Sequence, residues 1–199
     1  QCGDLGESFE PVYQALREEV LAEGVAFADE TGVRVQQSNN GPPKDAFMWL
    51  YANRHGDCVF DYNESRGRDS PSRMLAGFKG YLHADGYAVY ELLFDPDCLK
   101  HVACWAHARR YFVEAQSRHK DLAQEAVEWI AKLFAIEKSA KERELSVDAI
   151  RELRQRESSV VLKGFRDWLE VALSQVLPQS PMADAIKYVF ARWEALSCF

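Results

Sequence analysis

Two aspartates, Asp29 and Asp85, stand where predicted strands end and could together bind a metal ion. Asp29 follows the apolar run 25–28, and Asp85 follows the strand-like run 81–84. Acids at the ends of buried strands can meet at one edge of a sheet, where carboxylate oxygens bind Mg²⁺ along with water and substrate phosphates. Two such ions about 3.5–4 Å apart stabilise the attacking and leaving oxygens of a phosphoryl transfer. The other explanation is that each aspartate is merely a turn residue or a helix cap.

A second group of polar side chains lies where a predicted strand passes into a helix. His107 falls in the first turn of this helix, and Arg109 and Arg110 follow it. Guanidinium groups bind phosphate through a bidentate fork, so these residues are candidates for contact with a phosphate backbone. Local hydrogen bonding of His107 and surface pairing of the arginines with acids such as Glu114 explain the same pattern without a ligand.

The even spacing of Cys98, His101, Cys104 and His107 suggests a zinc site, because zinc is commonly held by four cysteine and histidine ligands. If a strand runs through Cys104, however, His101 and Cys104 point to opposite faces of it. The four side chains would then not converge. We therefore expect no zinc here, and we expect Cys104 to be a small buried residue beneath the active edge of the sheet.

The elements that must position these residues are predicted to form a mixed sheet. The first three strands can form an antiparallel meander, whereas the fourth and fifth follow crossover helices and should join in parallel. This order is the one that an RNase H-like α/β core with a five-stranded sheet requires. The predicted elements are a helix over 9–21 with Pro11 in its first turn, a first strand over 25–28 with strand-like alternation resuming over 32–35, strands over 46–53 and 58–62, a short helix from Ser70, strands over 81–84 and 102–105, and a helix over 106–118.

Beyond residue 120 the pattern becomes helical throughout. The segments 122–143 and 147–177 are long, charged and helically periodic, and Ser180 with Pro181 is typical of the start of a final helix. Four aromatic residues are expected to pack the two long helices together as an insertion beside the sheet. They are Trp129, Phe134, Phe165 and Trp168.

The composition is that of an ordinary globular protein with an acidic balance. Hydrophobic residues make up 47% of the 199 residues, and the net charge is −7. A protein that binds DNA by itself usually has an excess of basic residues. Segments outside this chain would therefore have to supply much of any affinity for DNA. Five irregularly spaced cysteines favour a reducing cytosol. The sequence has no apolar run long enough for a bilayer and no recognisable signal peptide, and its first residue is not Met, which suggests a fragment or a processed chain.

Several strings of the sequence closely resemble the transposases of the IS-sixty-six insertion-sequence family, of the transposase C type. The resemblance runs in order from about residue 9 to residue 199. The strings beginning at Ala84 and Cys104 are the most specific. The matching strings are Asp29-Glu30-Thr31, 75–80, Ala84-Asp85-Gly86-Tyr87, Ala103-Cys104-Trp105-Ala106-His107-Ala108-Arg109-Arg110, Ser180-Pro181 and Arg192-Trp193-Glu194-Ala195-Leu196.

The resemblance implies an RNase H-like catalytic core over residues 1–119, a helical insertion over 120–178, and a helix over 179–199 that leads to the last acid. Asp29 would be the first catalytic acid and Asp85 the second, both as ligands of Mg²⁺ or Mn²⁺. The family's third acid is a Glu in a later segment that is not in this chain, and Glu194 is not that residue. Cys104 and His107 resemble a Cys-x-x-His pair found at this junction in many transposases.

We therefore expect the catalytic domain of a DDE-type DNA transposase, which nicks DNA and joins the resulting 3′-hydroxyl to a target. Its expected partners are transposon ends, target DNA, further copies of itself and other element-encoded proteins, in the cytoplasm and nucleoid of a bacterium and not at a membrane. The chain alone is expected to be inactive without the third acid. The alternatives are a non-catalytic, transposase-derived interaction domain and, more distantly, an RNase H-like nuclease.

Overall fold

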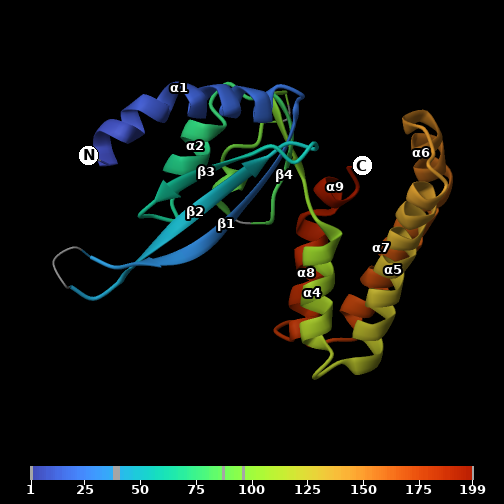
Figure 1. Ribbon diagram of the computed structural model, residues 1–199. Coiled ribbons are helices and arrows are strands. Elements are labelled where there is room, and N and C mark those ends of the chain that lie inside the picture. Colours follow the sequence, from blue (N-terminus) through green and yellow to red (C-terminus); the bar gives the residue numbers. More distant parts are fainter. Residues whose placement is uncertain (1, 38–40, 87, 96, 199) are drawn as a thin grey trace. The chain divides into compact units, whose positions relative to one another are not determined.

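The computed structural model describes residues 2–37, 41–86, 88–95 and 97–198 (Figure 1). The contacts within the chain divide it into two compact units, Gln1–Ala103 and Cys104–Phe199. The first unit contains all the strands of the described residues, and the second is helical. No helix in the described ranges is both long enough and apolar enough to cross a lipid bilayer.

The first unit is built on one mixed sheet of five strands in the order β3-β2-β1-β4-β5. β1 pairs with β2, and β2 with β3, in antiparallel fashion, whereas β1 pairs with β4, and β4 with β5, in parallel. The predicted fold class is confirmed, and this sheet is consistent with an RNase H-like core. The strands are β1 (Val25–Val35), β2 (Lys44–Ala52), β3 (Cys58–Asn63), β4 (Gly80–His83) and β5 (Leu99–Val102).

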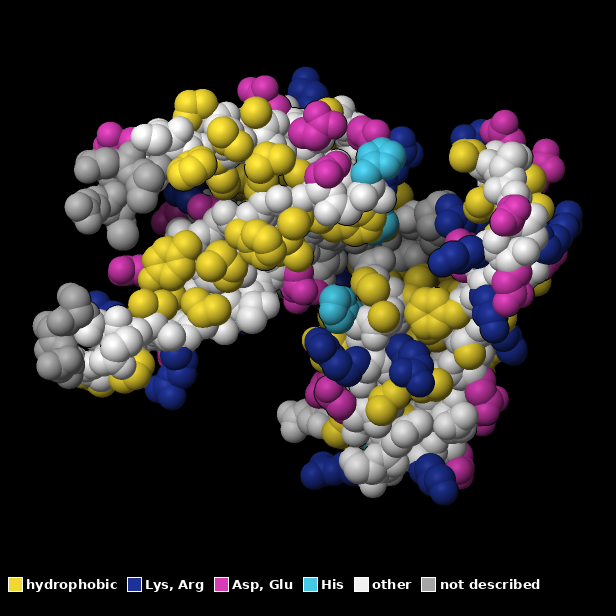
Figure 2. Space-filling view, viewed as in Figure 1, with side chains coloured by type: hydrophobic (Ala, Val, Ile, Leu, Met, Phe, Trp, Pro, Cys, Tyr) yellow, Lys and Arg dark blue, Asp and Glu magenta, His cyan; other side chains and the backbone are white. Residues whose placement is uncertain are grey.

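The two faces of the sheet differ because side chains alternate along each strand. Ala26 and Ala28 of β1 are buried on one face, where they join a core that includes Trp49, Tyr51 and Leu82. On the other face apolar side chains remain exposed, and Figure 2 shows such side chains gathered over the strands. Those that are exposed on this second face include Phe27, Phe60, Tyr62 and Tyr81.

The described residues of the first unit also form the helices α1 (Cys2–Leu21), α2 (Asp69–Met74) and α3 (Ala88–Glu91). Residues from all three helices contribute to the buried core. The prediction for Pro11 was wrong, because α1 begins nine residues earlier and Pro11 lies inside it.

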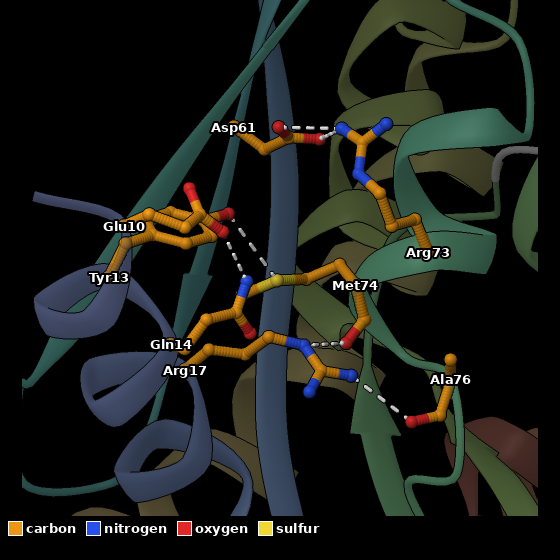
Figure 3. Close-up of a pocket in the computed structure, with 8 residues that line it drawn as sticks. All are labelled: Glu10, Tyr13, Gln14, Arg17, Asp61, Arg73, Met74 and Ala76. Carbon is orange, nitrogen blue, oxygen red and sulfur yellow. Dashed lines mark hydrogen bonds and ion pairs between the residues drawn. The ribbon is translucent and has the colours of Figure 1, made fainter. Parts of the chain in front are cut away.

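Polar contacts fasten α1 to the segment around α2 (Figure 3). Arg17 donates from Nε to the carbonyl of Met74 at 2.9 Å and from Nη2 to the carbonyl of Ala76 at 3.1 Å. Arg73 donates to both carboxylate oxygens of Asp61 on β3, at 2.7 and 2.8 Å. These residues line a cavity of about 660 Å³ between α1, α2 and β3. Arg17 thus holds α1 to α2 and the residues that follow it, and Arg73 holds α2 to β3.

The second unit consists of α4 (Trp105–Ala115), α5 (Lys120–Glu142), α6 (Val147–Leu153), a π-helical segment (Arg154–Ser158), α7 (Ser159–Ser174), α8 (Pro181–Ala191) and α9 (Trp193–Leu196). The predicted start of the final helix is confirmed, because Ser180 Oγ accepts a hydrogen bond from the backbone N–H of Ala183 at 3.2 Å and Pro181 is the first residue of α8. The segment predicted as one helix over 147–177 is instead α6 and α7, joined by the π-helical segment.

Phe165 is the centre of the aromatic core of the second unit. It is fully buried, and its ring lies 6.0 Å from that of Trp129 and 6.1 Å from that of Trp168. The predicted packing of α5 against α7 is therefore confirmed for these three residues. It was wrong for Phe134, a residue that is 42% exposed. Side chains along α5 turn by about 100° per residue. Leu133 therefore faces the core, whereas the side chain of Phe134 points away from it toward solvent.

Candidate metal-binding carboxylates

The pairing of β1 with β4 brings together the residues that come just before Asp29 and Asp85. Phe27 lies opposite His83 in the parallel register, and their rings stack with centroids 4.6 Å apart. Asp29 follows Phe27 by two residues, and Asp85 follows His83 by two residues. Tyr87, which completes the string that begins at Ala84, lies outside the described residues.

One detail of the prediction for Asp29 was wrong. Asp29 does not come after a strand but lies inside β1, which continues to Val35 because its other edge remains paired with β2 as far as Lys44. The pairing of β1 with β4 ends at Phe27, so β1 is paired only with β2 at Asp29. The backbone N–H of Glu30 donates to Asp29 Oδ1 at 3.0 Å. Asp29 is exposed and Asp85 is half-buried.

Glu30, the next residue along β1, was missed as a separate feature of the site. Its side chain is only 2% exposed and forms an ion pair with Arg66 Nη2 at 2.5 Å. Burial raises the pKa of Glu30, Arg66 acts against this rise, and the charges of Asp85 and Asp29 add to it. Alternation along a strand would have indicated that Glu30 and Asp29 lie on opposite faces, if β1 had been predicted to continue through both.

Aromatic residues of the buried face of the sheet lie near Glu30. Trp49 lies opposite Glu30 in the register of β1 and β2, and the ring of Tyr90 lies 6.0 Å from that of Trp49. Burial raises the pKa of Tyr90, and the charges of Tyr51, Glu30, Asp85 and Asp29 raise it further. Within the described part of the chain, Glu30 Oε2, Trp49 Nε1 and the hydroxyls of Tyr51 and Tyr90 have no hydrogen-bond partner.

The backbone just before Asp85 is held by β5. The N–H of Ala84 donates to the carbonyl of Val102 at 3.3 Å, and the carbonyl of Ala84 lies 3.2 Å from His101 Nε2. His101 is half-buried and stacks on Phe94, with ring centroids 4.4 Å apart and planes 11° from parallel. Its role in this structure is therefore to contact the chain next to Asp85.

The donor set formed by Asp29 and Asp85 suits a hard divalent cation. Both side chains offer carboxylate oxygens, which Mg²⁺ and Mn²⁺ prefer. Over the described ranges no group of three or more histidine, cysteine, aspartate or glutamate side chains is close enough to hold a metal ion. A metal site built on these two aspartates would therefore need water, phosphate oxygens or a further protein ligand to complete its coordination shell.

The second unit carries the other predicted site residues. His107 lies in the first turn of α4, as predicted, and Arg109 and Arg110 follow on the same helix with exposed side chains. The prediction for Cys104 was wrong: it is exposed. β5 ends at Val102, and Cys104 is instead the residue that caps α4, with its carbonyl accepting from the N–H groups of His107 and Ala108 at 3.1 and 3.2 Å.

The comparisons with known proteins agree with these observations. A sequence model described as "Transposase IS66 family" matches residues 1–199. Two relatives from Sinorhizobium fredii (strain NBRC 101917 / NGR234), uncharacterized proteins y4qI and y4jD, are each 29% identical to the chain over 99% and 95% of its length. The chain covers only 39% and 40% of these relatives. A third protein from the same strain, y4hP, is 23% identical over the whole chain. Because the family match extends over the entire sequence, this chain belongs to the Transposase IS66 family.

Proposed function

We propose that this chain is the part of a DDE-type DNA transposase that carries the first two catalytic carboxylates, Asp29 and Asp85. The observation that supports this most directly is the parallel register of β1 and β4, in which the two aspartates follow the facing residues Phe27 and His83 by the same number of positions. Family membership supplies the substrate class, which is DNA.

Asp29 and Asp85 would hold Mg²⁺ or Mn²⁺ between adjacent strands. The bound ions would activate water or a 3′-hydroxyl and stabilise the charge that develops on the leaving oxygen. A third carboxylate, which the family resemblance places after residue 199, would complete the coordination shell. The pairing of β1 with β2 holds the backbone of Asp29 in place. The contact of His101 with the carbonyl of Ala84 holds the backbone just before Asp85.

The same site would serve two reactions in sequence. In the first, a phosphodiester at the transposon end is hydrolysed, leaving a 3′-hydroxyl. In the second, that hydroxyl attacks a phosphodiester of the target DNA. We propose that His107, Arg109 and Arg110 contact DNA phosphates, because a guanidinium group can bind phosphate at two points and both arginines are exposed on α4.

The chain spans about two fifths of the length of the relatives it matches, so the complete reaction and its partners are proposed for a longer protein. These partners are transposon ends, target DNA, further copies of the transposase and other proteins of the element. The reaction would take place in the bacterial cytoplasm, at the nucleoid, where the DNA lies.

Binding of Mn²⁺ to the 199-residue chain tests the metal site directly. We expect Asp29→Asn and Asp85→Asn each to weaken binding, measured from the electron paramagnetic resonance signal of free Mn²⁺. Asp45→Asn is the matched control, since it removes the same charge from an aspartate that is 80% exposed on β2. Equal binding by the wild type and all three variants would show that Asp29 and Asp85 are not ligands.

Activity distinguishes the proposed function from its alternatives. In a protein of the relatives' length that contains this chain, nicking and joining of transposon-end DNA in Mg²⁺ should both be lost in Asp85→Asn. Cleavage without joining would indicate a nuclease. Absence of both reactions in the unsubstituted protein would indicate a non-catalytic role.

A further inference from the structure

Asp85 stands on the connection between β4 and α3, so its own backbone is not part of a strand. The peptide group that links Ala84 to Asp85 is planar. Fixing the carbonyl oxygen of Ala84 therefore also fixes the direction in which the chain enters Asp85. His101 Nε2 lies 3.2 Å from this oxygen, and Ala84 itself is 5% exposed.

The imidazole of His101 is held in place from two directions. Its face stacks on Phe94, with centroids 4.4 Å apart, and its backbone is paired with Leu82 in the register of β4 and β5. Phe94 and Asp85 both belong to the crossover between β4 and β5, so His101 contacts this crossover near its start and near its end. A carbonyl oxygen only accepts hydrogen bonds, so Nε2 of His101 must carry the proton that it donates to Ala84.

We propose that His101 is a positioning residue for Asp85: its Nε2–H bond to the carbonyl of Ala84 sets the direction of the Asp85 carboxylate toward the metal. This inference rests on the proposed function, in which Asp85 is a metal ligand. His101 is not itself a ligand in this arrangement, because its Nε2 is directed at the backbone. Groups that orient a ligand from outside the coordination shell typically change metal affinity about 10- to 100-fold when removed.

Two substitutions separate the hydrogen bond from the stacking. His101→Phe keeps an aromatic ring against Phe94 and removes the donor. His101→Gln removes the ring and keeps an N–H donor at a similar distance from the backbone. We expect His101→Phe to weaken Mn²⁺ binding about tenfold, and His101→Gln to retain most of the wild-type affinity. His55→Phe is the matched control, because His55 lies in the β2–β3 turn and contacts Glu23 instead.

Thermal unfolding of each variant, followed by circular dichroism, provides the structural readout. Wild-type affinity in a folded His101→Phe protein would overturn the inference, as would a His101→Gln protein that binds Mn²⁺ more weakly than His101→Phe. An unsubstituted chain that binds no Mn²⁺ would overturn the proposed function and this inference with it. Mn²⁺ binding that is weakened in His101→Phe but not in His101→Gln or His55→Phe, and that requires Asp29 and Asp85, supports the proposed function and this inference.

A measurement on the unsubstituted chain makes the test independent of how the variants fold. Nitrogen-15 NMR distinguishes the protonated from the unprotonated ring nitrogen of a neutral histidine. We expect the signals of His101 to show a proton on Nε2. A neutral His101 with its proton on Nδ1 could not donate to Ala84 and would overturn the inference.

Discussion

The guanidinium of Arg66 donates two hydrogen bonds to the carboxylate of Glu30, from Nη2 at 2.5 Å and from Nε at 3.1 Å. Glu30 is buried on the face of β1 opposite to Asp29, whereas Arg66 is 48% exposed. The pair joins the loop between β3 and α2 to the strand that carries a proposed metal ligand. Its strength therefore bears on how firmly β1 is held beside the site.

Removing Arg66 should destabilise the fold, because it leaves the Glu30 carboxylate buried without its cation. We expect Arg66→Gln to lower the free energy of unfolding by about 2 kcal/mol, less than the roughly 3–5 kcal/mol for a fully buried pair. Arg34→Gln is the control, since Arg34 and Asp45 form an exposed pair at 3.6 Å that should contribute less than about 1 kcal/mol. Equal urea-unfolding midpoints for the two variants would contradict this expectation.

Glu30 should make the stability of the fold depend on pH. Its pKa is raised in the folded protein, mainly by burial, from the ordinary value of 4.5. The resulting stabilisation is complete below the ordinary pKa and is lost as pH rises through the folded pKa. We expect this fall in the free energy of unfolding to be absent in Glu30→Gln, measured by urea unfolding at several pH values without metal. The same dependence in both proteins would show that another group is responsible.

Glu23 provides a contrast of opposite sign. Hydrogen bonds from His55 and then Arg54 lower its pKa. Its contribution to stability is therefore present above the ordinary pKa and is lost as pH falls through the folded value. In urea unfolding at several pH values, Glu23→Gln should show a smaller loss of the free energy of unfolding below pH 4.5. The fall above pH 4.5, which we attribute to Glu30, should be the same as in the wild type.

The two glycines Gly80 and Gly56 should respond differently to the same substitution. Both have positive φ, 142° and 95°, so alanine is strained at either position. A Cβ at Gly80 would also overlap the carbonyl of Gly24, whereas a Cβ at Gly56 would meet nothing within 4 Å. We expect Gly56→Ala to cost about 1 kcal/mol and Gly80→Ala at least about twice that. Thermal unfolding of the two variants checks the order, and a larger loss for Gly56→Ala would contradict it.

In the second unit, Phe165 and Phe134 form a matched pair on the packed and exposed sides of the helices. Phe165 is fully buried and Phe134 is 42% exposed. Phe165→Ala should lower the free energy of unfolding by about 3–5 kcal/mol because it leaves a cavity in the aromatic core. Phe134→Ala should change it by less than about 1 kcal/mol. Similar losses in urea unfolding would mean that Phe134 is covered by a contact absent from this structure.

Much of the fold could be predicted because local patterns report on local structure. The order of strands and crossover helices predicted the mixed sheet, and Ser180 with Pro181 predicted the start of α8, whose cap is formed by neighbouring atoms. Asp29 and Asp85 could also be chosen as candidates from their places beside apolar runs. The elements and candidate residues behind these inferences were each recognised from residues a few positions apart.

What only the tertiary structure decided depends on segments that are distant in sequence. The continued pairing with β2 decided that Asp29 lies inside a strand and that Glu30 is buried behind it. The crossover between β4 and β5 decided that His101 contacts Ala84, 17 positions away. Periodicity gives the side of a strand or helix on which a residue lies, but burial and hydrogen bonding depend on which neighbour covers that side, and long-range pairing alone determines the neighbour.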